Sequence, residues 1–484
     1  MEASAKDFSY RRRQPEESIL YKTLACHLNT FLANLAEEGQ WLPKHVEKEL
    51  WAYLECGILA YGFVRVQCDD CKNEQLVAFS CKKRGFCPSC GAKRMAETAA
   101  HLVENIIPWV KVRQYVLSVP IPLRYWMASD KKLLAKVHKV FASEVERFYT
   151  ERSTKNRSGS IAFVQRFGSA LNLNIHFHML QIEGLYEPRT TGRPKFRKGK
   201  SPTNKDIEDL VAKISKRVVR LLRRTGHLGE LGPDETPVDP LFEEDPTYAS
   251  CMSASVKNRI ALGERRGQRV RFIGSGFGYE GEQPALKGKL CAMVNGFSLH
   301  AAVRIPRHRR DQLERLIRYT ARSSVCMDRM SITETGDIIY ELGSVWKNGI
   351  THVLLSPLEL IEKLAALVPL PNMHSSRYWG VIAPNSKMRK EVIPGKTRAE
   401  IKKEKEKSAE QEDLEKKPNK GSWSKLLSKV FGVDISKCRE CGGEMRVTSS
   451  IVRVDVIQKI LTHLGLSPQP PPVAPARSRQ LFLV

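Results

Sequence analysis

Two pairs of closely spaced cysteines constrain the fold of this chain more than any other feature. Cys68 and Cys71 form one Cys-x-x-Cys pair, and Cys87 and Cys90 form a second pair after fifteen intervening residues. Such spacing is typical of a zinc site in which two turns each supply two thiolates to one tetrahedral ion. We therefore expect these four residues to hold one structural zinc, with Cys81 as an alternative ligand or as a buried free thiol.

A third pair of cysteines lies near the end of the sequence, in "CRECGG". Cys438 and Cys441 supply only two thiolates, which do not complete a zinc shell. The nearest nitrogen ligand downstream is His463. A second zinc at this pair is therefore left open by the sequence.

The charge balance of the chain indicates a polyanionic partner. Lys and Arg number 79 against 53 Asp and Glu, which gives a net charge of +26. Solvated helix faces explain a modest excess, but one of this size favours nucleic acid first and an anionic membrane second. No uncharged apolar run is long enough to span a membrane, and the first residues lack the apolar core of a secretory signal. We expect a cytoplasmic protein, associated with the bacterial nucleoid, whose twelve cysteines are reduced.

The hydrophobic patterns along the chain predict an α+β fold with strands and helices alternating through a long middle region. A run of residues that are almost all charged or polar predicts a linker after it. The expected regions are an N-terminal helical region (1–55), a zinc-binding domain (56–108), a mixed region (109–390), a charged linker (391–421) and a small C-terminal unit (422–484).

The stretch "LNLNIHFHML" contains two histidines one residue apart in an apolar run. On a strand, His176 and His178 point to one face and Phe177 to the other. Each buried imidazole needs partners for both of its nitrogens, so filling the core with two of them is unfavourable. A site with nitrogen and oxygen ligands and no thiolate suits Mg²⁺ or Mn²⁺ used as a Lewis acid.

A third metal ligand is expected on a neighbouring element. The segment "SIAFVQRF" precedes the histidine strand by a short connection, and a hairpin across it places Gln165 roughly opposite His176. Asn174 shares the histidine face and is a competitor. Glu183 is a second competitor, although its parity places it on the opposite face.

Among the thirteen tyrosines, Tyr319 has the surroundings of a nucleophile. It lies at the border of the buried stripe of the helix "RDQLERLIRYTAR", and Arg315 and Arg322 share its side. Nearby guanidinium groups favour a phenolate and also bind phosphate. An ordinary amphipathic tyrosine at the edge of the core is the alternative interpretation.

Taken in order, these segments resemble a known family. The cysteine cluster ending in "SCKKRGFCPSC" is followed by "YVLSVPIPLR", "QRFGSALNLNIHFHML" and "LHAAVRIPRHRRDQLERLIRYTAR". This set is similar to the rolling-circle transposases of the insertion sequence 91 family, which belong to the HUH endonuclease superfamily. The resemblance extends over nearly the whole chain, from about residue 15 to 470.

The resemblance implies a central antiparallel sheet flanked by helices over 109–390, with the histidines on a middle strand and the tyrosine on a facing helix. It implies that His176 and His178 bind the catalytic metal, that Tyr319 is the catalytic tyrosine, and that the N-terminal cysteines bind zinc. Some relatives carry a second tyrosine where this chain has Ser323. Gly343 stands where a lysine is common, and Lys347 is the alternative cation.

The implied function is a DNA transposase that nicks and rejoins single-stranded or hairpin DNA at the ends of a mobile element. Tyr319 would form a 5′-phosphotyrosine with the help of a divalent metal. With one tyrosine per chain, cleaving two ends needs two protomers, as in a homodimer, or sequential reuse of the residue. The alternatives are a plasmid replication initiator or relaxase with the same chemistry, and a zinc-containing DNA-binding protein without catalysis.

Overall fold

The computed structural model describes residues 14–150, 157–190, 193–228, 239–274, 288–346, 349–395, 438 and 440–477. Its centre is an antiparallel sheet with the strand order β15-β4-β5-β3-β10-β9, and β11 also pairs with β3. This arrangement confirms the expected α+β class. The strands are β3 (Val112–Ser118), β4 (Gly159–Phe167), β5 (Leu173–Ile182), β9 (Cys291–Val294), β10 (Phe297–His300), β11 (Arg304–Ile305) and β15 (Ser376–Gly380).

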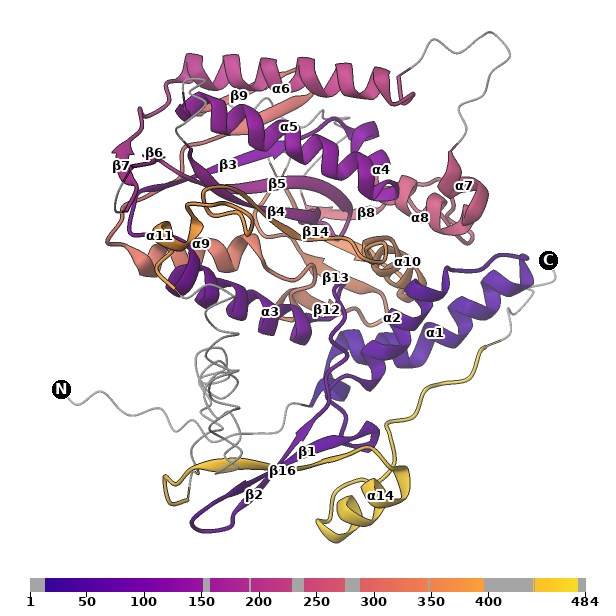
Figure 1. Cartoon of the computed structure of the whole chain (residues 1–484). Helices are drawn as coiled ribbons and strands as arrows, with labels where there is room; N and C mark the ends of the chain where they lie inside the picture. Colours follow the sequence, from indigo (N-terminus) through magenta and orange to yellow (C-terminus); the bar gives the residue numbers. More distant parts are fainter. Residues whose placement is uncertain are drawn as a thin grey trace.

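Helices cover both faces of this central sheet (Figure 1). Phe177 and its neighbours of the same parity on β5 face α5 (Lys131–Thr150) and α6 (Asn204–Arg224). Leu180 and Ile182 face the other side and join the core of α3 (Pro88–His101) and α9 (Arg310–Thr320). Both sides of β5 are therefore buried, so its polar side chains must find partners inside the protein.

The hairpin of β4 and β5 follows the sequence prediction. Gln165 lies directly opposite His176 in the register of the two strands. The connection is tight: the Gly168 amide donates to the Asn172 carbonyl at 2.9 Å, and Leu171 adopts a φ of 53°. Between Gln165 and Phe167 the register shifts, and such irregularities often re-aim side chains beside active sites.

The N-terminal residues form helices, as expected: α1 (Ile19–Glu37) and α2 (Lys44–Glu55). Helix α1 packs against α10 (Pro357–Leu367), and a second antiparallel sheet with the order β12-β13-β14-β8 lies beside them. Its strands are β8 (Arg271–Gly274), β12 (Met330–Ile332), β13 (Ile338–Glu341) and β14 (Ile350–Leu355).

Several shorter elements connect these layers. The prolines that follow β3 begin a helix, α4, that the sequence pattern did not reveal. The remaining elements include α4 (Ile121–Ser129), α7 (Pro240–Glu244), α8 (Pro246–Val256), α11 (Arg389–Val392), β6 (Gly184–Glu187), β7 (Lys195–Lys198), the 3₁₀ turns η1 (Pro15–Glu17), η2 (Leu59–Tyr61) and η4 (Met327–Arg329), and the π-helical turn η3 (Leu102–Ile106).

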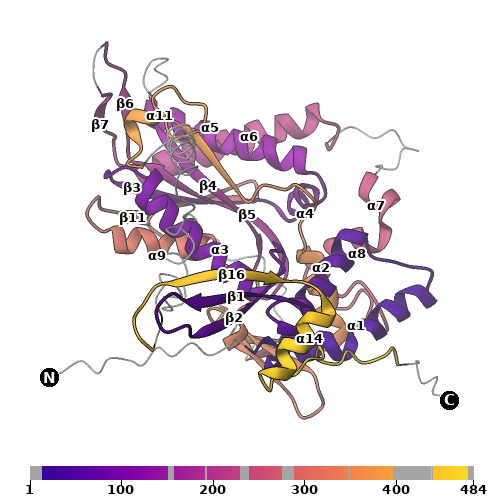
Figure 2. The same ribbon diagram turned by 60° about the horizontal axis from the view of Figure 1, so that its bottom comes forward.

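The C-terminal segment does not form the separate unit that the sequence suggested. Strand β16 (Met445–Ile451) pairs with β1 (Phe63–Cys68), which also pairs with β2 (Glu74–Ala78). Helix α14 (Val454–His463) packs its Ile457 and Leu461 on Leu59 and Phe63. Figure 2 shows these N-terminal and C-terminal segments side by side in one small module. Local sequence patterns cannot show this pairing because it joins distant parts of the chain.

The predicted charged linker begins later than expected. Val392 and Ile393 are buried in the core beside α9, so the chain is still part of the packed fold there. Most of the predicted linker lies outside the described residues. In the part of the chain that the structure describes, no helix is long and apolar enough to cross a membrane.

Candidate catalytic and zinc sites

Eight of the cysteines form two groups of four, so the expectation that Cys68, Cys71, Cys87 and Cys90 share one zinc site is wrong. Cys68 and Cys71 lie with Cys438 and Cys441, whereas Cys87 and Cys90 lie with Cys56 and Cys81. The sulfur atoms of each group lie within 4.8 Å of one another. A tetrahedral zinc with 2.3 Å bonds requires sulfur–sulfur separations of about 3.8 Å. Both groups therefore fit the geometry of a zinc ion.

The group formed by Cys56, Cys81, Cys87 and Cys90, here called the inner cysteine site, is mostly buried. Cys87 and Cys90 begin α3, and Cys56 ends α2. The Cys56 sulfur is 3.7 Å from the sulfurs of both Cys87 and Cys90, and Cys81 is 3.4 Å from Cys90. Cys81 is thus a full member of the site. The sequence argument missed Cys56 because it lacks a cysteine partner at knuckle spacing.

The outer cysteine site joins the two ends of the small module. The Cys68 and Cys441 sulfurs are 3.5 Å apart, and those of Cys71 and Cys438 are 3.3 Å apart. The two thiolates that Cys438 and Cys441 lacked are therefore supplied by the N-terminal pair. His463 lies at the end of α14 and is not in either cysteine group.

We expect a Cys438→Ser, Cys441→Ser variant to contain one zinc ion fewer than the wild-type protein, because two oxygen ligands do not replace thiolates in a structural site. A Cys68→Ser, Cys71→Ser variant should lose the same single ion. Metal content measured by mass spectrometry checks both. A Cys438→Ser, Cys441→Ser protein that keeps all of its zinc would contradict this grouping.

The two histidines share one face of β5, as the parity argument predicted. Their ring centroids are 4.9 Å apart, and the Phe177 ring stacks on His138 on the other side of the sheet. Burial lowers the pKa of His176 to about 4 and that of His178 to about 3. Both imidazoles are therefore neutral at pH 7 and keep a lone pair for a metal.

Hydrogen bonds orient both rings. The Asn174 carbonyl lies 2.9 Å from Nδ1 of His176, and because a carbonyl only accepts, Nδ1 must carry the proton. This leaves the Nε2 lone pair of His176 free. The Nε2 of His178 is buried and has no hydrogen-bond partner within the described chain. An orphaned imidazole nitrogen beside a second free lone pair fits a divalent metal site.

Gln114 is a residue of this site that the sequence argument missed. It lies on β3, and its amide nitrogen is 2.9 Å from Nδ1 of His178. Rotating the amide by 180° places its oxygen at this position, where it accepts the Nδ1 proton and leaves Nε2 of His178 free to bind metal. The polar Gln114 between apolar residues of the strand "VRQYVLS" was the available signal.

We expect Gln114→Leu to weaken Mn²⁺ binding by about 10–100-fold, the usual cost of losing the partner that orients a ligating histidine. Gln114→Glu keeps an acceptor for Nδ1 and should retain most of the affinity. Calorimetric titration with Mn²⁺ measures both variants. Equal affinities for Gln114→Leu and the wild type would exclude this role.

The three candidates for a third ligand are placed differently. Gln165 is 3 % exposed, lies opposite His176, and its amide nitrogen is 3.5 Å from the Tyr319 carbonyl. Asn174 has a buried Oδ1 with no partner among the described residues. Glu183 is bound by Arg113 and Arg304, each at 2.7 Å, and is therefore committed to a buried ion-pair network.

Helix α9 presents Tyr319 to the histidine pair. The ring centroids of Tyr319 and His178 are 5.9 Å apart in an edge-on arrangement, and the tyrosine is 52 % exposed. Leu313, Ile317 and Thr320 bury the opposite side of the helix, as the periodicity predicted. At the start of the helix, Arg310 donates to the carbonyls of Pro108, Ile107 and Val103.

The two arginines predicted to flank Tyr319 differ. Arg322 lies 5.1 Å from the centroid of the Tyr319 ring. Arg315 is 71 % exposed in its side chain and pairs with Asp311 at 2.7 Å, so the structure does not bring it to the tyrosine ring. Ser323, where some relatives have a second tyrosine, lies just beyond the helix. It packs closely on Gly91, since a Cβ added to Gly91 would be 2.5 Å from the Ser323 Cβ. The site therefore contains a single tyrosine on this helix.

Gly343 lies against another cation. A Cβ at this position would be 2.8 Å from Nη1 of Arg329, so a guanidinium already lies next to it. Lys347, the alternative cation suggested by the sequence, falls outside the described residues.

Comparisons with known proteins identify two family matches in this chain. The transposase family model Y2_Tnp matches residues 159–391, which contain the histidine pair and the tyrosine. The model of the transposase zinc-binding domain, Zn_Tnp_IS91, matches residues 25–119, which contain the inner cysteine site. Neither the search of curated proteins nor the search of solved structures found a match. The two matches together cover about two thirds of the chain, which therefore belongs to the transposases of the insertion sequence 91 family.

Proposed function

We propose that this transposase nicks and rejoins single-stranded DNA at the ends of its mobile element through Tyr319. The single observation that supports this most strongly is the edge-on approach of Tyr319 to His178, whose Nε2 is buried without a partner in the described structure. A half-exposed phenol beside a metal-binding nitrogen is the arrangement that attack on a bound phosphate requires.

His176, His178 and Gln165 are the residues that would hold Mg²⁺ or Mn²⁺. When bound, such an ion supplies Lewis-acid polarisation of a phosphoryl oxygen. Gln114 and the Asn174 carbonyl orient the two imidazoles, and Arg322 adds positive charge beside the phenol.

In the cleavage step, the phenolic oxygen of Tyr319 forms a bond to the scissile phosphorus, and the bond from phosphorus to the 3′ oxygen breaks. The tyrosine proton is lost to solvent, and the leaving 3′ oxygen gains a proton. The 5′-phosphotyrosine keeps the energy of the phosphodiester, so attack by another 3′-hydroxyl rejoins the strand without ATP. Two ends are processed by two protomers or by two successive rounds.

The polarity of the adduct tests this proposal. Single-stranded DNA covering an element end is labelled at its 5′ end or at its 3′ end and incubated with the protein and Mn²⁺. We expect the 3′-labelled fragment to remain attached to the protein on a denaturing gel, and the 5′-labelled fragment to be released with a free 3′-hydroxyl. Attachment of the 5′-labelled fragment instead would contradict a 5′-phosphotyrosine.

The rival functions predict other results. A replication initiator or relaxase would make the same adduct but would not join the strand to an unrelated target DNA. A zinc-containing DNA-binding protein without catalysis would form no adduct with any divalent metal. A strand-joining assay with a second oligonucleotide therefore separates all three.

A further inference from the structure

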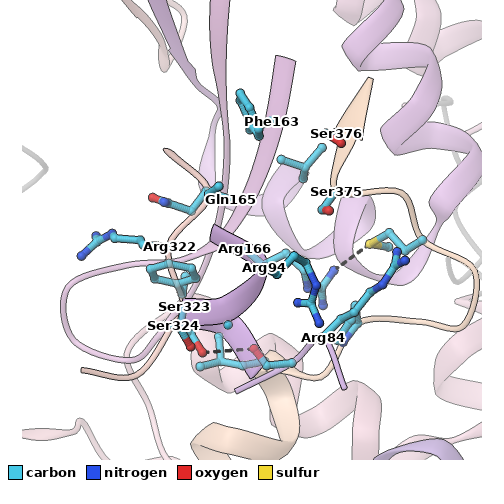
Figure 3. Close-up of a pocket in the computed structure, with 18 of the residues that line it drawn as sticks. Arg84, Arg94, Phe163, Gln165, Arg166, Arg322, Ser323, Ser324, Ser375 and Ser376 are labelled. Atoms are coloured by element: carbon cyan, nitrogen blue, oxygen red, sulfur yellow. Dashed lines mark hydrogen bonds between the residues drawn. The ribbon is translucent and has the colours of Figure 1, made fainter. Parts of the chain in front are cut away.

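A strongly basic pocket of about 120 Å³ lies beside the candidate catalytic site (Figure 3). It is formed where α3, the end of β4, the residues after α9 and the segment before β15 meet. A buried water needs only about 15 Å³, so the pocket has room for a larger polar group. No Asp or Glu is among the described residues that line it. Its cationic lining residues are Lys83, Arg84, Arg94, Arg166 and Arg322.

Arg166 is the most unusual of these side chains. It is 9 % exposed, and its Nη1 lies 3.4 Å from the Met373 sulfur, a weak acceptor. Its Nε and Nη2 are buried with no hydrogen-bond partner in the described part of the chain. Burial lowers the pKa of Arg166; the Tyr248 phenol acts in the opposite direction, and no carboxylate of the described residues does so. A buried cation without a counter-charge is costly, so the protein maintains a guanidinium that an anion would stabilise.

Of the neighbouring arginines, Arg94 lies beside Arg166, whereas the Arg322 guanidinium points away from both (Figure 3). Arg94 donates to the Lys83 carbonyl at 2.7 Å, which holds its guanidinium at the pocket wall. Arg322 lies 5.1 Å from the ring of Phe167 and has a buried Nε without a partner among the residues described. Ser and Thr hydroxyls add further donors to the lining.

One carboxylate acts on part of this group. Glu49 accepts the Gly85 amide and interacts with Lys83 and Arg94, although burial raises its own pKa. It therefore offsets some of the charge on the side of the zinc module. Among the residues that the structure describes, no carboxylate does the same for Arg166.

We propose that this pocket binds a backbone phosphate of the DNA strand, next to the phosphate that Tyr319 attacks. Guanidinium groups bind phosphate oxygens through strong, charge-assisted hydrogen bonds. Arg322 connects the pocket to the tyrosine, since it lies 5.1 Å from the rings of both Tyr319 and Phe167. The inference rests on the proposed function for the choice of strand, but the phosphate site itself does not depend on cleavage.

Such a contact would set the position of the strand rather than read its sequence. The pocket lies between α3 of the zinc-binding domain and β4 of the catalytic sheet. A phosphate held there would therefore fix the register of the strand relative to both parts of the protein, and so the nucleotide at which cleavage occurs.

Binding of a thymidine 30-mer at several salt concentrations tests the phosphate site without requiring cleavage. We expect Arg166→Met to weaken binding by about ten-fold and to reduce the slope of log K against log salt by about 0.7, the value for one contact to a single strand. Arg166→Lys should retain most of the slope. Arg224→Met, at the exposed end of α6, is the matched control. It should change the affinity and the salt slope less than Arg166→Met does.

Arg94→Gln repeats the test from the partly exposed side of the pocket, which covers the case in which Arg166→Met does not fold. Zinc content and thermal unfolding identify that case. Unchanged affinity and salt slope in a folded Arg166→Met or Arg94→Gln protein would overturn the proposal.

A second experiment identifies which phosphate is bound. Element-end oligonucleotides carry one neutral methylphosphonate at successive positions, and the wild-type protein should bind one of them about ten-fold more weakly. The same methylphosphonate should not weaken the binding of the Arg166→Met protein any further. The DNA assignment would be overturned if no position were coupled to Arg166 and inorganic phosphate alone stabilised the wild type against heat. The pocket would then be a site for small anions.

The two proposals fail separately. If the wild-type protein forms no tyrosine adduct but shows the coupled position, the phosphate pocket stands and the cleavage mechanism fails. If the adduct forms and no position is coupled to Arg166, the mechanism stands and the pocket proposal fails.

Discussion

Tyr319→Phe abolishes the covalent protein–DNA adduct and reduces strand cleavage by on the order of 10⁴-fold or more, which is the expected result if its hydroxyl is the nucleophile. Phenylalanine keeps the ring that contacts His178 and Arg322, so the site should remain folded. Affinity for single-stranded DNA should change by no more than about two-fold, because the variant keeps every cationic side chain of the protein. A denaturing gel and a binding titration measure the two effects.

The matched control is Tyr61→Phe, which removes another exposed phenol, in the zinc-binding domain. It should form the adduct at the wild-type rate. An adduct that persists in Tyr319→Phe, or one that disappears equally in Tyr61→Phe, would show that the nucleophile lies elsewhere.

The second large effect is expected at the histidine pair. His176→Ala and His178→Ala should each reduce cleavage by about 10³-fold, because each removes a nitrogen that we propose as a ligand of the divalent ion. The double variant should be little worse than either single variant, since the two residues act as one unit. Single-turnover cleavage measured over a range of Mn²⁺ concentrations tests this expectation.

Two controls separate the catalytic metal from the structural zinc. All three variants should retain the zinc content of the wild type, and His463→Ala, at the exposed end of α14, should cleave normally. Cleavage that is unaffected in His178→Ala would remove the histidine pair from the mechanism.

The same variants should also respond differently to acid. The pKa values of His176 and His178 are depressed to about 4 and about 3 in the fold, so below pH 6.5 the unfolded chain takes up protons first. Stability conferred by the neutral imidazoles is therefore complete above pH 6.5 and is lost as the pH falls toward 4. The metal-free alanine variants should lose less stability than the wild type over this range.

Much of the candidate site could be predicted from local patterns. Alternation along β5 placed His176 and His178 on one face, and the short connection to β4 placed Gln165 opposite His176. The helical periodicity of α9 identified the buried side of the helix and left Tyr319 at its border. These predictions succeed because strand parity, hairpin register and helix periodicity depend on residues that are close in sequence.

The grouping of the cysteines shows where such reasoning ends. Knuckle spacing correctly indicates that Cys68 and Cys71 act together, but it does not say which second pair completes the shell. The structure uses Cys438 and Cys441, and Cys71 is 367 positions from Cys438. Only the path of the chain, through the pairing of β1 with β16, decides this partner.

The sequence by itself determined that this protein has strands, helices and metal-binding motifs of a DNA-processing enzyme, because these depend on residue type and short-range spacing. Tertiary structure alone decided the two cysteine sites, the contact of Gln114 with His178 and the placement of Arg166 in a basic pocket. Each of these joins side chains from separate elements, and their proximity follows from packing of the whole chain rather than from any local pattern.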